Sequence, residues 1–129
     1  MQSLKNIFIN GGMILVLLLG LTISATAAPT FEETKLLAEQ GDSLSQAYLG
    51  TLYSDGKGVR QDYSKALKWF KKSADQNNEP AQSQMGIIYE FGYGVRQNKT
   101  IAKEWYGKSC DNGYQGSCDR YRILNEQGY

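Results

Sequence analysis

The chain of 129 residues contains no histidine, only two cysteines and only two prolines. Histidine is the commonest general base near neutral pH and the commonest metal ligand, so its absence removes both roles from the candidate chemistry. Two cysteines without a histidine do not complete a tetrahedral zinc site. The 14 basic and 13 acidic residues leave a formal charge of +1, which does not indicate a nucleic-acid partner. We therefore expect neither a metal ion nor a cofactor.

An apolar run over residues 13–23 lies near the N-terminus. It is shorter than the roughly 20 apolar residues that a membrane helix needs. Lys5 precedes this run, and an Ala-x-Ala pattern that ends at Ala27 follows it, as at a signal-peptide cleavage site. The sequence thus predicts a signal peptide over residues 1–27, with an uncleaved anchor as the alternative. We expect an exported bacterial protein, periplasmic or secreted, without stable membrane insertion after cleavage.

A 36-residue repeat is the strongest pattern in the chain. When residues 46–80 are aligned with residues 82–116, 13 positions are identical. The identities include small and aromatic residues at fixed spacing: Gly50/Gly86, Tyr53/Tyr89, Gly56/Gly92, Gly58/Gly94, Ala66/Ala102 and Trp69/Trp105. Repeats of this length are typical of stacked helix pairs. The pattern predicts an all-α fold, a short α-solenoid of antiparallel helix pairs.

Each repeat has the pattern of a helix, a turn and a second helix. Gly56 is predicted to end the first helix, because glycine reaches the left-handed backbone conformation without a Cβ clash. Asp62 is a favourable N-cap for the second helix, and Asn98 takes this place in the second repeat. Gly50 and Ala66 are small enough to let the paired helices approach closely.

The repeat divides the exported chain into four parts. Two full repeats are expected at residues 45–80 and 81–116. An N-terminal capping helix is expected within residues 28–44, and a C-terminal capping helix within residues 117–129. The two caps are degenerate copies of half a repeat, as expected for the ends of a stack.

The first repeat carries the residues of a known motif: Leu49, Gly50, Tyr53, Gly56, Gly58, Val59, Asp62, Tyr63, Ala66, Trp69 and Phe70. This pattern resembles the Sel-one-like repeat, a relative of the tetratricopeptide repeat. The resemblance implies an α-solenoid that binds proteins or peptides. Some exported members of this family look like immunity proteins that neutralise periplasmic toxins, including secreted lipase effectors, and others are cysteine-rich.

Both cysteines lie in the part of the chain that is expected to be exported. An even number of cysteines in an oxidising compartment favours a disulfide over two free thiols. The resemblance implies that Cys110 and Cys118 form this pair, since they bracket a turn between two antiparallel helices. The other repeats have alanine and glutamine at the matching positions.

A catalytic alternative comes from Ser54 and Lys57, which match the Ser-x-x-Lys motif of serine β-lactamases. Some cysteine-rich relatives are associated with β-lactam binding or hydrolysis. However, the Ser-Asp-Asn and Lys-Thr-Gly motifs do not follow in this chain, and the repeat turn already explains Gly56. We therefore expect no enzyme, with a β-lactam-binding or β-lactamase-like enzyme and a structural envelope adaptor as the alternatives.

The aromatic residues fall into two groups. Trp69, Trp105, Tyr53 and Tyr89 recur at inward positions of the repeat, which predicts core packing rather than a ligand cage. Three tyrosines vary between the repeats and are therefore candidates for contacts with a partner: Tyr48, Tyr93 and Tyr114.

The first helices of stacked pairs line the concave side of a solenoid. Residues there that packing does not require are the candidate partner-binding residues: Tyr48, Thr51, Asp55, Gln84, Ile87, Phe91 and Tyr93. Ile87 and Phe91 would form an exposed apolar patch, which often marks a binding site. The alternative is that Ile87 packs against the neighbouring repeat. We expect a monomer whose partner is another protein, with a toxin effector among the candidates.

Overall fold

The computed structural model describes residues 27–129, and this part of the chain contains six α-helices and no strand. The helices are α3 (Phe31–Glu39), α4 (Ser43–Asp55), α5 (Tyr63–Ala74), α6 (Glu79–Phe91), α7 (Lys99–Asp111) and α8 (Gln115–Glu126). The predicted all-α solenoid is confirmed. The expected signal peptide lies outside the described residues, apart from Ala27. None of the described helices is long and apolar enough to span a membrane.

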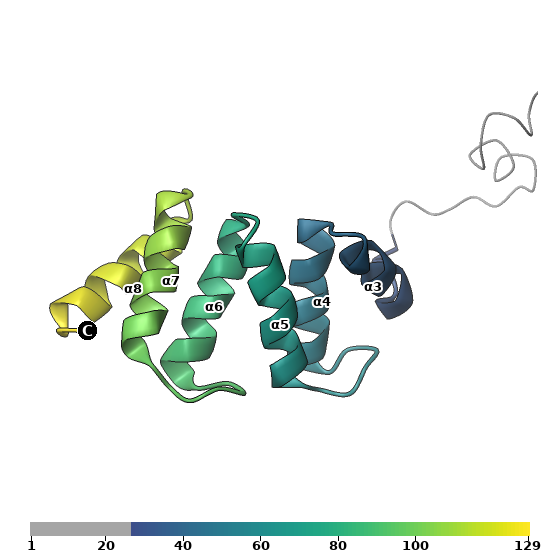
Figure 1. Ribbon diagram of the computed structural model, residues 1–129, viewed down its shortest axis with the longest axis horizontal. Coiled ribbons are helices and arrows are strands. Elements are labelled where there is room, and N and C mark those ends of the chain that lie inside the picture. Colours follow the sequence, from purple (N-terminus) through teal and green to yellow (C-terminus); the bar gives the residue numbers. More distant parts are fainter. Residues whose placement is uncertain (1–26) are drawn as a thin grey trace, which may run out of the picture.

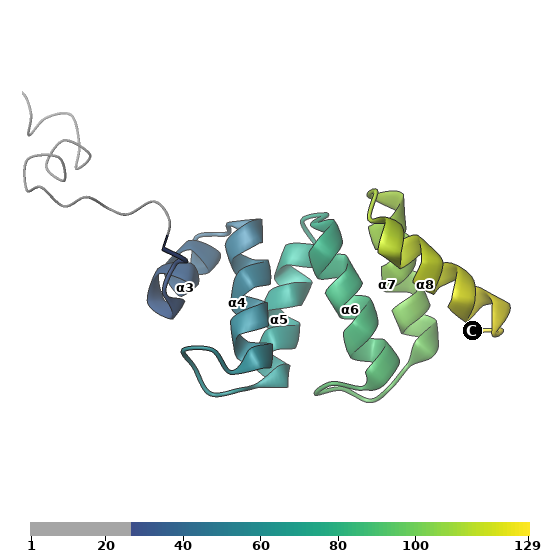
Figure 2. The same ribbon diagram turned by 180° about the vertical axis from the view of Figure 1, so that it is seen from behind.

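The helices follow one another in a row, and each packs against the next one along the chain (Figure 1). The short turns lie at one end of the helices and the two long glycine-containing loops at the other. Helix α5 covers α4 in the first view, whereas α8 covers α7 in the view from behind (Figure 2). The first helices of the units, α4, α6 and α8, therefore form one layer and the second helices form the other.

The helices begin two residues earlier than the predicted units. Helix α4 begins at Ser43, two residues before residue 45, and α8 begins at Gln115. The first predicted unit begins at Ser45, the first residue of the helical face that also carries Leu49, Leu52 and Tyr53. The helices instead begin after their capping residues, as Asp42 caps α4 with its carboxylate.

The predicted caps of the second helices are present. The Asp62 side chain accepts a hydrogen bond from the backbone nitrogen of Lys65 at 3.0 Å, and Asn98 accepts one from Ile101 at 2.9 Å. Gly56 ends α4 with φ of 67°, the left-handed conformation that favours glycine. These local signals explain why each helix begins and ends where it does.

The shorter first helix, α3, has a cap of its own. Thr30 and Glu33 form a capping box, and the hydrogen bonds from Thr30 lower the pKa of the Glu33 carboxyl. Glu33 stands where the full repeats have tryptophan, so the capping half-repeat uses this position to begin a helix. Among the described helices, α3 packs mainly against α4, and a departure from the repeat is expected for a terminal unit.

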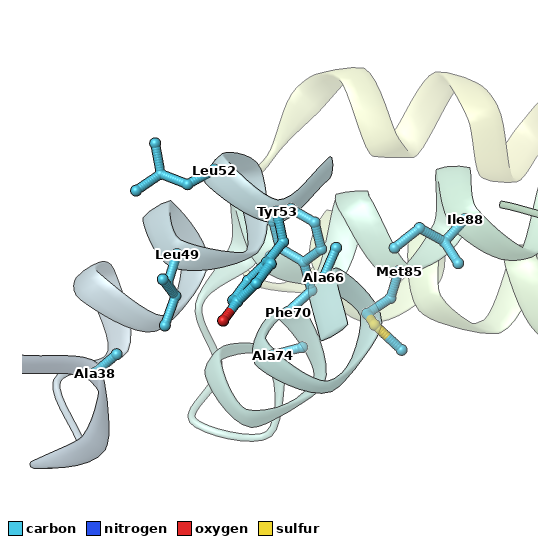
Figure 3. Close-up of a cluster of buried hydrophobic side chains, with 10 residues drawn as sticks. Ala38, Leu49, Leu52, Tyr53, Ala66, Phe70, Ala74, Met85 and Ile88 are labelled. Carbon is cyan, nitrogen blue, oxygen red and sulfur yellow. The ribbon is translucent and has the colours of Figure 1, made fainter. Parts of the chain in front are cut away.

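The core lies between the two helix layers. Its main cluster contains buried side chains from α3 to α6: Ala38, Leu49, Leu52, Tyr53, Ala66, Phe70, Ala74, Ala81, Met85 and Ile88 (Figure 3). A second cluster of Ala102, Tyr106 and Leu124 holds α7 and α8 together. The repeat therefore builds a continuous core from residues that it brings back every 36 positions.

Two glycines make room for aromatic rings of the paired helix. A Cβ atom at Gly50 would lie 2.8 Å from the ring of Phe70, and one at Gly86 would lie 2.6 Å from the ring of Tyr106. Ala66 is fully buried, in agreement with the predicted close approach. The structure adds that the glycines face a ring one helical turn further along the partner helix.

The tryptophans are half-buried rather than fully buried. Trp69 and Trp105 pack against the main core cluster with part of their surface. The Lys72 ammonium lies 4.6 Å from the centroid of the Trp69 ring, and the Lys108 ammonium lies 4.4 Å from that of Trp105. The predicted packing role holds, and the remaining ring surface carries a cation of the chain itself.

A side-chain clamp recurs at each turn between units. The Gln46 amide donates to the Ala38 carbonyl at 3.1 Å, and Gln82 donates to Ala74 at the same distance. In the last unit these positions are Cys110 and Cys118, which form a disulfide with their Cα atoms 4.7 Å apart. The disulfide thus replaces the buried hydrogen bond of the other units at the C-terminal end of the stack.

Removal of the disulfide is expected to destabilise the protein. The Cys110→Ala/Cys118→Ala variant should lose about 2.5 kcal/mol of unfolding free energy, because the unfolded chain regains the entropy of a short closed loop. Urea denaturation under oxidising conditions measures this loss. Reduction of the wild type should reproduce the loss and leave the variant unchanged. A variant as stable as the oxidised wild type would contradict the prediction.

The structure also suggests a matched variant for this experiment. Cys110→Ala with Cys118→Gln restores the residues that the first two units have at these positions. We expect this variant to be more stable than the double alanine variant, because the amide regains a buried hydrogen-bond acceptor.

Candidate protein-binding site

A hollow of about 230 Å³ lies between α4 and α6, close to the long loop of the second unit. Eight residues line it: Ser54, Asp55, Tyr63, Phe70, Gln84, Ile87, Ile88 and Tyr93. We call it the α4–α6 hollow. Four of the seven candidate partner-binding residues are among them, namely Asp55, Gln84, Ile87 and Tyr93. The structure thus brings together candidates that are up to 38 residues apart in the sequence.

Three aromatic rings form a row beside the hollow. Tyr93 stacks on Tyr63 with ring centroids 5.5 Å apart, and Phe91 stacks on Tyr93 with centroids 5.9 Å apart. All three side chains are exposed, Phe91 by 55%. We call Tyr63, Tyr93 and Phe91 the aromatic row. These three rings are exposed to solvent, and the other repeat has no aromatic residue at the matching positions.

The long loop of the second unit positions Tyr93. Gly94 follows it with φ of 69°, and a Cβ atom there would lie 2.7 Å from the Tyr63 Cβ atom. Only glycine allows this loop to approach the start of α5 so closely. The close approach brings Tyr63, a residue outside the set predicted from the sequence, into the site. In the sequence Tyr63 belongs to the motif of the first repeat, and the second repeat has Lys99 at this position.

Ile87 and Phe91 differ in their surroundings. Ile87 is half-buried and packs against the second core cluster, which is the packing alternative raised for it. It also lines the α4–α6 hollow. Phe91 is more than half exposed, so the exposed apolar surface of this pair belongs mainly to Phe91.

Three further candidates, two on α4 and one at the start of α8, do not line the hollow. Thr51 is half-buried, and its hydroxyl donates to the Ala47 carbonyl at 3.2 Å. Tyr48 is 37% exposed and lies about two helical turns before Asp55. Tyr114 is exposed at the N-cap of α8. None of these three residues is among those that line the hollow.

A buried charge network occupies the corresponding place in the second unit. Glu90 is 4% exposed, and it accepts a hydrogen bond from the Tyr106 hydroxyl at 2.8 Å. The guanidinium of Arg120, on α8, forms an ion pair with the other Glu90 oxygen. Burial raises the pKa of Tyr106 to about 12.

The sequence did not indicate this network. Its three members lie on three helices and up to 30 residues apart, so no local pattern links them. The available signals were two differences between the repeats: Glu90 stands where the first unit has Ser54, and Arg120 lies 36 residues after Gln84.

The residues of the Ser-x-x-Lys pattern have separate partners. The Ser54 hydroxyl donates to the Thr51 carbonyl at 3.1 Å, whereas the Lys57 ammonium lies 3.7 Å from the Asp55 carboxylate. Within residues 27–129, no group of three or more histidine, cysteine, aspartate or glutamate side chains is placed to hold a metal ion.

Comparison with protein families identifies the repeat. The model described as "Sel1 repeat" matches residues 43–78 and again residues 79–114. These units begin at the same residues as α4 and α6. A putative sel1-like repeat-containing protein of Acanthamoeba polyphaga mimivirus is 45% identical over 43 residues, which is 33% of this chain and 7% of the viral protein.

Solved structures share the architecture. A Sel1 repeat protein from Oxalobacter formigenes has a TM-score of 0.72 and 29% identity over 77% of this chain and 40% of its own. A protective antigen of uropathogenic Escherichia coli strains, which displays an SLR fold, has a TM-score of 0.74 and 33% identity. The match covers 76% of this chain and 21% of the antigen. Helicobacter pylori cysteine rich protein B has a TM-score of 0.66 and 26% identity, and the match covers 69% of this chain and 67% of the Helicobacter protein. The chain thus spans less than half of the viral, Oxalobacter and Escherichia proteins.

Proposed function

Because the chain belongs to the Sel1 repeat family, we propose that it binds a partner protein through the face that α4 and α6 form. Sel1 repeat proteins are generally non-catalytic interaction modules. The observation that supports this face is the aromatic row beside the α4–α6 hollow. Exposed aromatic rings at the mouth of a small hollow are the usual anchors of protein interfaces.

We also propose that the protein acts outside the cytoplasm. The disulfide between Cys110 and Cys118 supports this, because such bonds persist in oxidising compartments. The pattern of the first 27 residues, as a signal peptide, supports the same conclusion. In this compartment the partner would be a toxin effector, such as a secreted lipase, which the protein binds and neutralises.

A pull-down experiment tests the proposed function. The protein, purified from cells that express the full chain, serves as bait for periplasmic extract and for the products of adjacent genes. We expect a toxin encoded beside this gene to be retained and to lose its activity in the complex. If neither source yields a partner, the proposal is wrong.

Two substitutions test the proposed face. Phe91→Asp with Tyr48→Ala should weaken binding of the retained partner at least about 30-fold, as expected for the loss of a buried aromatic anchor. Leu36→Asp is the matched control, because Leu36 lies on α3 and is 57% exposed, close to the 55% of Phe91. Helical content measured by circular dichroism should be the same in all three proteins. Equal affinity of the two variants would assign binding to another surface.

A further inference from the structure

The place that corresponds to the α4–α6 hollow one repeat later holds two of the chain's own basic side chains. Three residues that line the hollow become, one repeat later, the buried charge network: Ser54 becomes Glu90, Phe70 becomes Tyr106 and Gln84 becomes Arg120. Helix α8 supplies the arginine there, just as α6 supplies the glutamine here.

The aromatic positions follow the same pattern. Tyr93 becomes Tyr129 one repeat later, and Tyr63 becomes Lys99. The Lys99 ammonium lies 4.9 Å from the centroid of the Tyr129 ring, a cation–π distance. In the first copy of the site, at the α4–α6 hollow, Tyr93 stacks on Tyr63 and keeps 42% of its surface exposed. The second copy of the site thus contains two cations of the chain, one on a carboxylate and one on a ring.

The first copy has the complementary charge. Asp55 is the one charged residue among the eight that line the α4–α6 hollow. Within residues 27–129 its ion-pair partner is Lys57, whose ammonium lies 3.7 Å away and whose side chain is 72% exposed. An exposed ion pair of this kind contributes little and is readily exchanged for a better partner.

We propose that the α4–α6 hollow binds an arginine side chain of the partner protein, an inference that rests on the proposed function. A guanidinium there would donate to the Asp55 carboxylate and pack against the aromatic row, whose Tyr63 and Tyr93 line the hollow. The amide oxygen of Gln84, at the position of the internal Arg120, provides a further acceptor. The arginine of the partner would supply the positive charge that Arg120 supplies in the second unit, where the first copy has the neutral Gln84 and carries its carboxylate on Asp55.

The size of the hollow agrees with one side chain. Its volume of about 230 Å³ is below the roughly 300–1,000 Å³ of pockets that enclose small organic ligands. The surrounding aromatic row supplies the flat apolar surface on which the rest of a peptide can lie. We therefore infer a protein segment with an exposed arginine as the occupant.

Peptide display tests this inference. The protein, purified from cells that express the full chain, is immobilised and used to select binders from a library of random 12-residue peptides. We expect one arginine at a fixed position in the selected peptides. Replacing this arginine by citrulline, a neutral analogue of the same shape, should weaken binding about tenfold or more.

Substitutions of the protein complete the experiment. Asp55→Asn should weaken the arginine peptide about tenfold and leave the citrulline peptide almost unaffected. Asp119→Asn is the matched control, since Asp119 lies on α8 outside the hollow and the change removes the same charge. The arginine peptide should also bind more weakly as salt is raised, whereas the citrulline peptide should not.

The possible outcomes separate this inference from the proposed function. Selected peptides that lose binding in Phe91→Asp but need no arginine would overturn the inference and leave the binding face in place. Lysine at the fixed position, with no preference for arginine, would also overturn it. A selection that yields no binder above an uncoated surface would count against both.

Discussion

Gly86→Ala is expected to lower the unfolding free energy by about 3 kcal/mol, at the upper end of the usual cost of overpacking. Alanine in the middle of a helix is ordinarily about 1 kcal/mol more favourable than glycine, so helix propensity predicts the opposite sign. The Cβ atom, however, would lie 2.6 Å from the Tyr106 ring. This ring is 1% exposed, and its hydroxyl is held by Glu90, so it has no free path away.

The first unit provides an internal comparison for this prediction. A Cβ atom at Gly50 would lie 2.8 Å from the ring of Phe70, which lines the α4–α6 hollow and has no hydroxyl to hold it. Gly50→Ala should therefore cost less than Gly86→Ala, because the ring can shift toward the hollow. The order of the two variants reports directly on how tightly each unit is packed.

Chemical denaturation of the variants measures these effects. Gly116→Ala is the control, because a Cβ atom there would lie 3.6 Å from Tyr114, an ordinary contact. We expect this control to be as stable as the wild type or slightly more so. A Gly86→Ala protein as stable as the wild type would show that α6 and α7 separate easily.

Arg120→Ala is expected to lower the unfolding free energy by about 3 kcal/mol. Removing one partner of a buried ion pair leaves the other charge without compensation, which typically costs about 3–5 kcal/mol. Glu90 is 4% exposed and would keep only the hydrogen bond from Tyr106. The Arg120 side chain is 39% exposed, so solvent reaches part of the pair and the low end of that range applies.

A triple variant distinguishes the charge from the packing. Glu90→Ser, Tyr106→Phe and Arg120→Gln together give the second unit the residues that line the α4–α6 hollow of the first. We expect this variant to be more stable than Arg120→Ala, because it leaves no buried charge. Urea denaturation of both variants measures the difference. A triple variant less stable than Arg120→Ala would contradict this expectation. It would show that the contacts of the network stabilise the protein by more than the burial of its charge destabilises it.

The fold could be predicted from the sequence because its signals are local and repeated. Gly56 and Asp62 end one helix and begin the next through backbone geometry and hydrogen bonds within a few residues. Apolar residues at helical spacing decide which face is buried, and each is seen twice because the unit recurs after 36 residues. The bounds of the units, 45–80 and 81–116, stay a prediction, while the helices α4 and α6 begin at Ser43 and Glu79, directly after their caps.

The candidate site could be predicted only in part. Asp55 and Gln84 were selected as positions that packing leaves free, and they do lie at one hollow. Ile87 proved to be half-buried, since α8 approaches it from the end of the chain. Exposure on a helix face is set by neighbouring helices, which the periodicity of one helix does not describe.

The sequence by itself determined the helices, their caps, their pairing and the positions of the core. Only the tertiary structure decided which side chains meet between units: Arg120 with Glu90, and Tyr63 with Tyr93. The physical reason is the range of the interactions. Helix formation depends on residues within one or two turns, whereas these contacts join elements about 30 residues apart in the sequence at definite distances, which the packing of glycines against rings helps to set. The proposed binding site belongs to this second class, because its residues come from three helices and one loop.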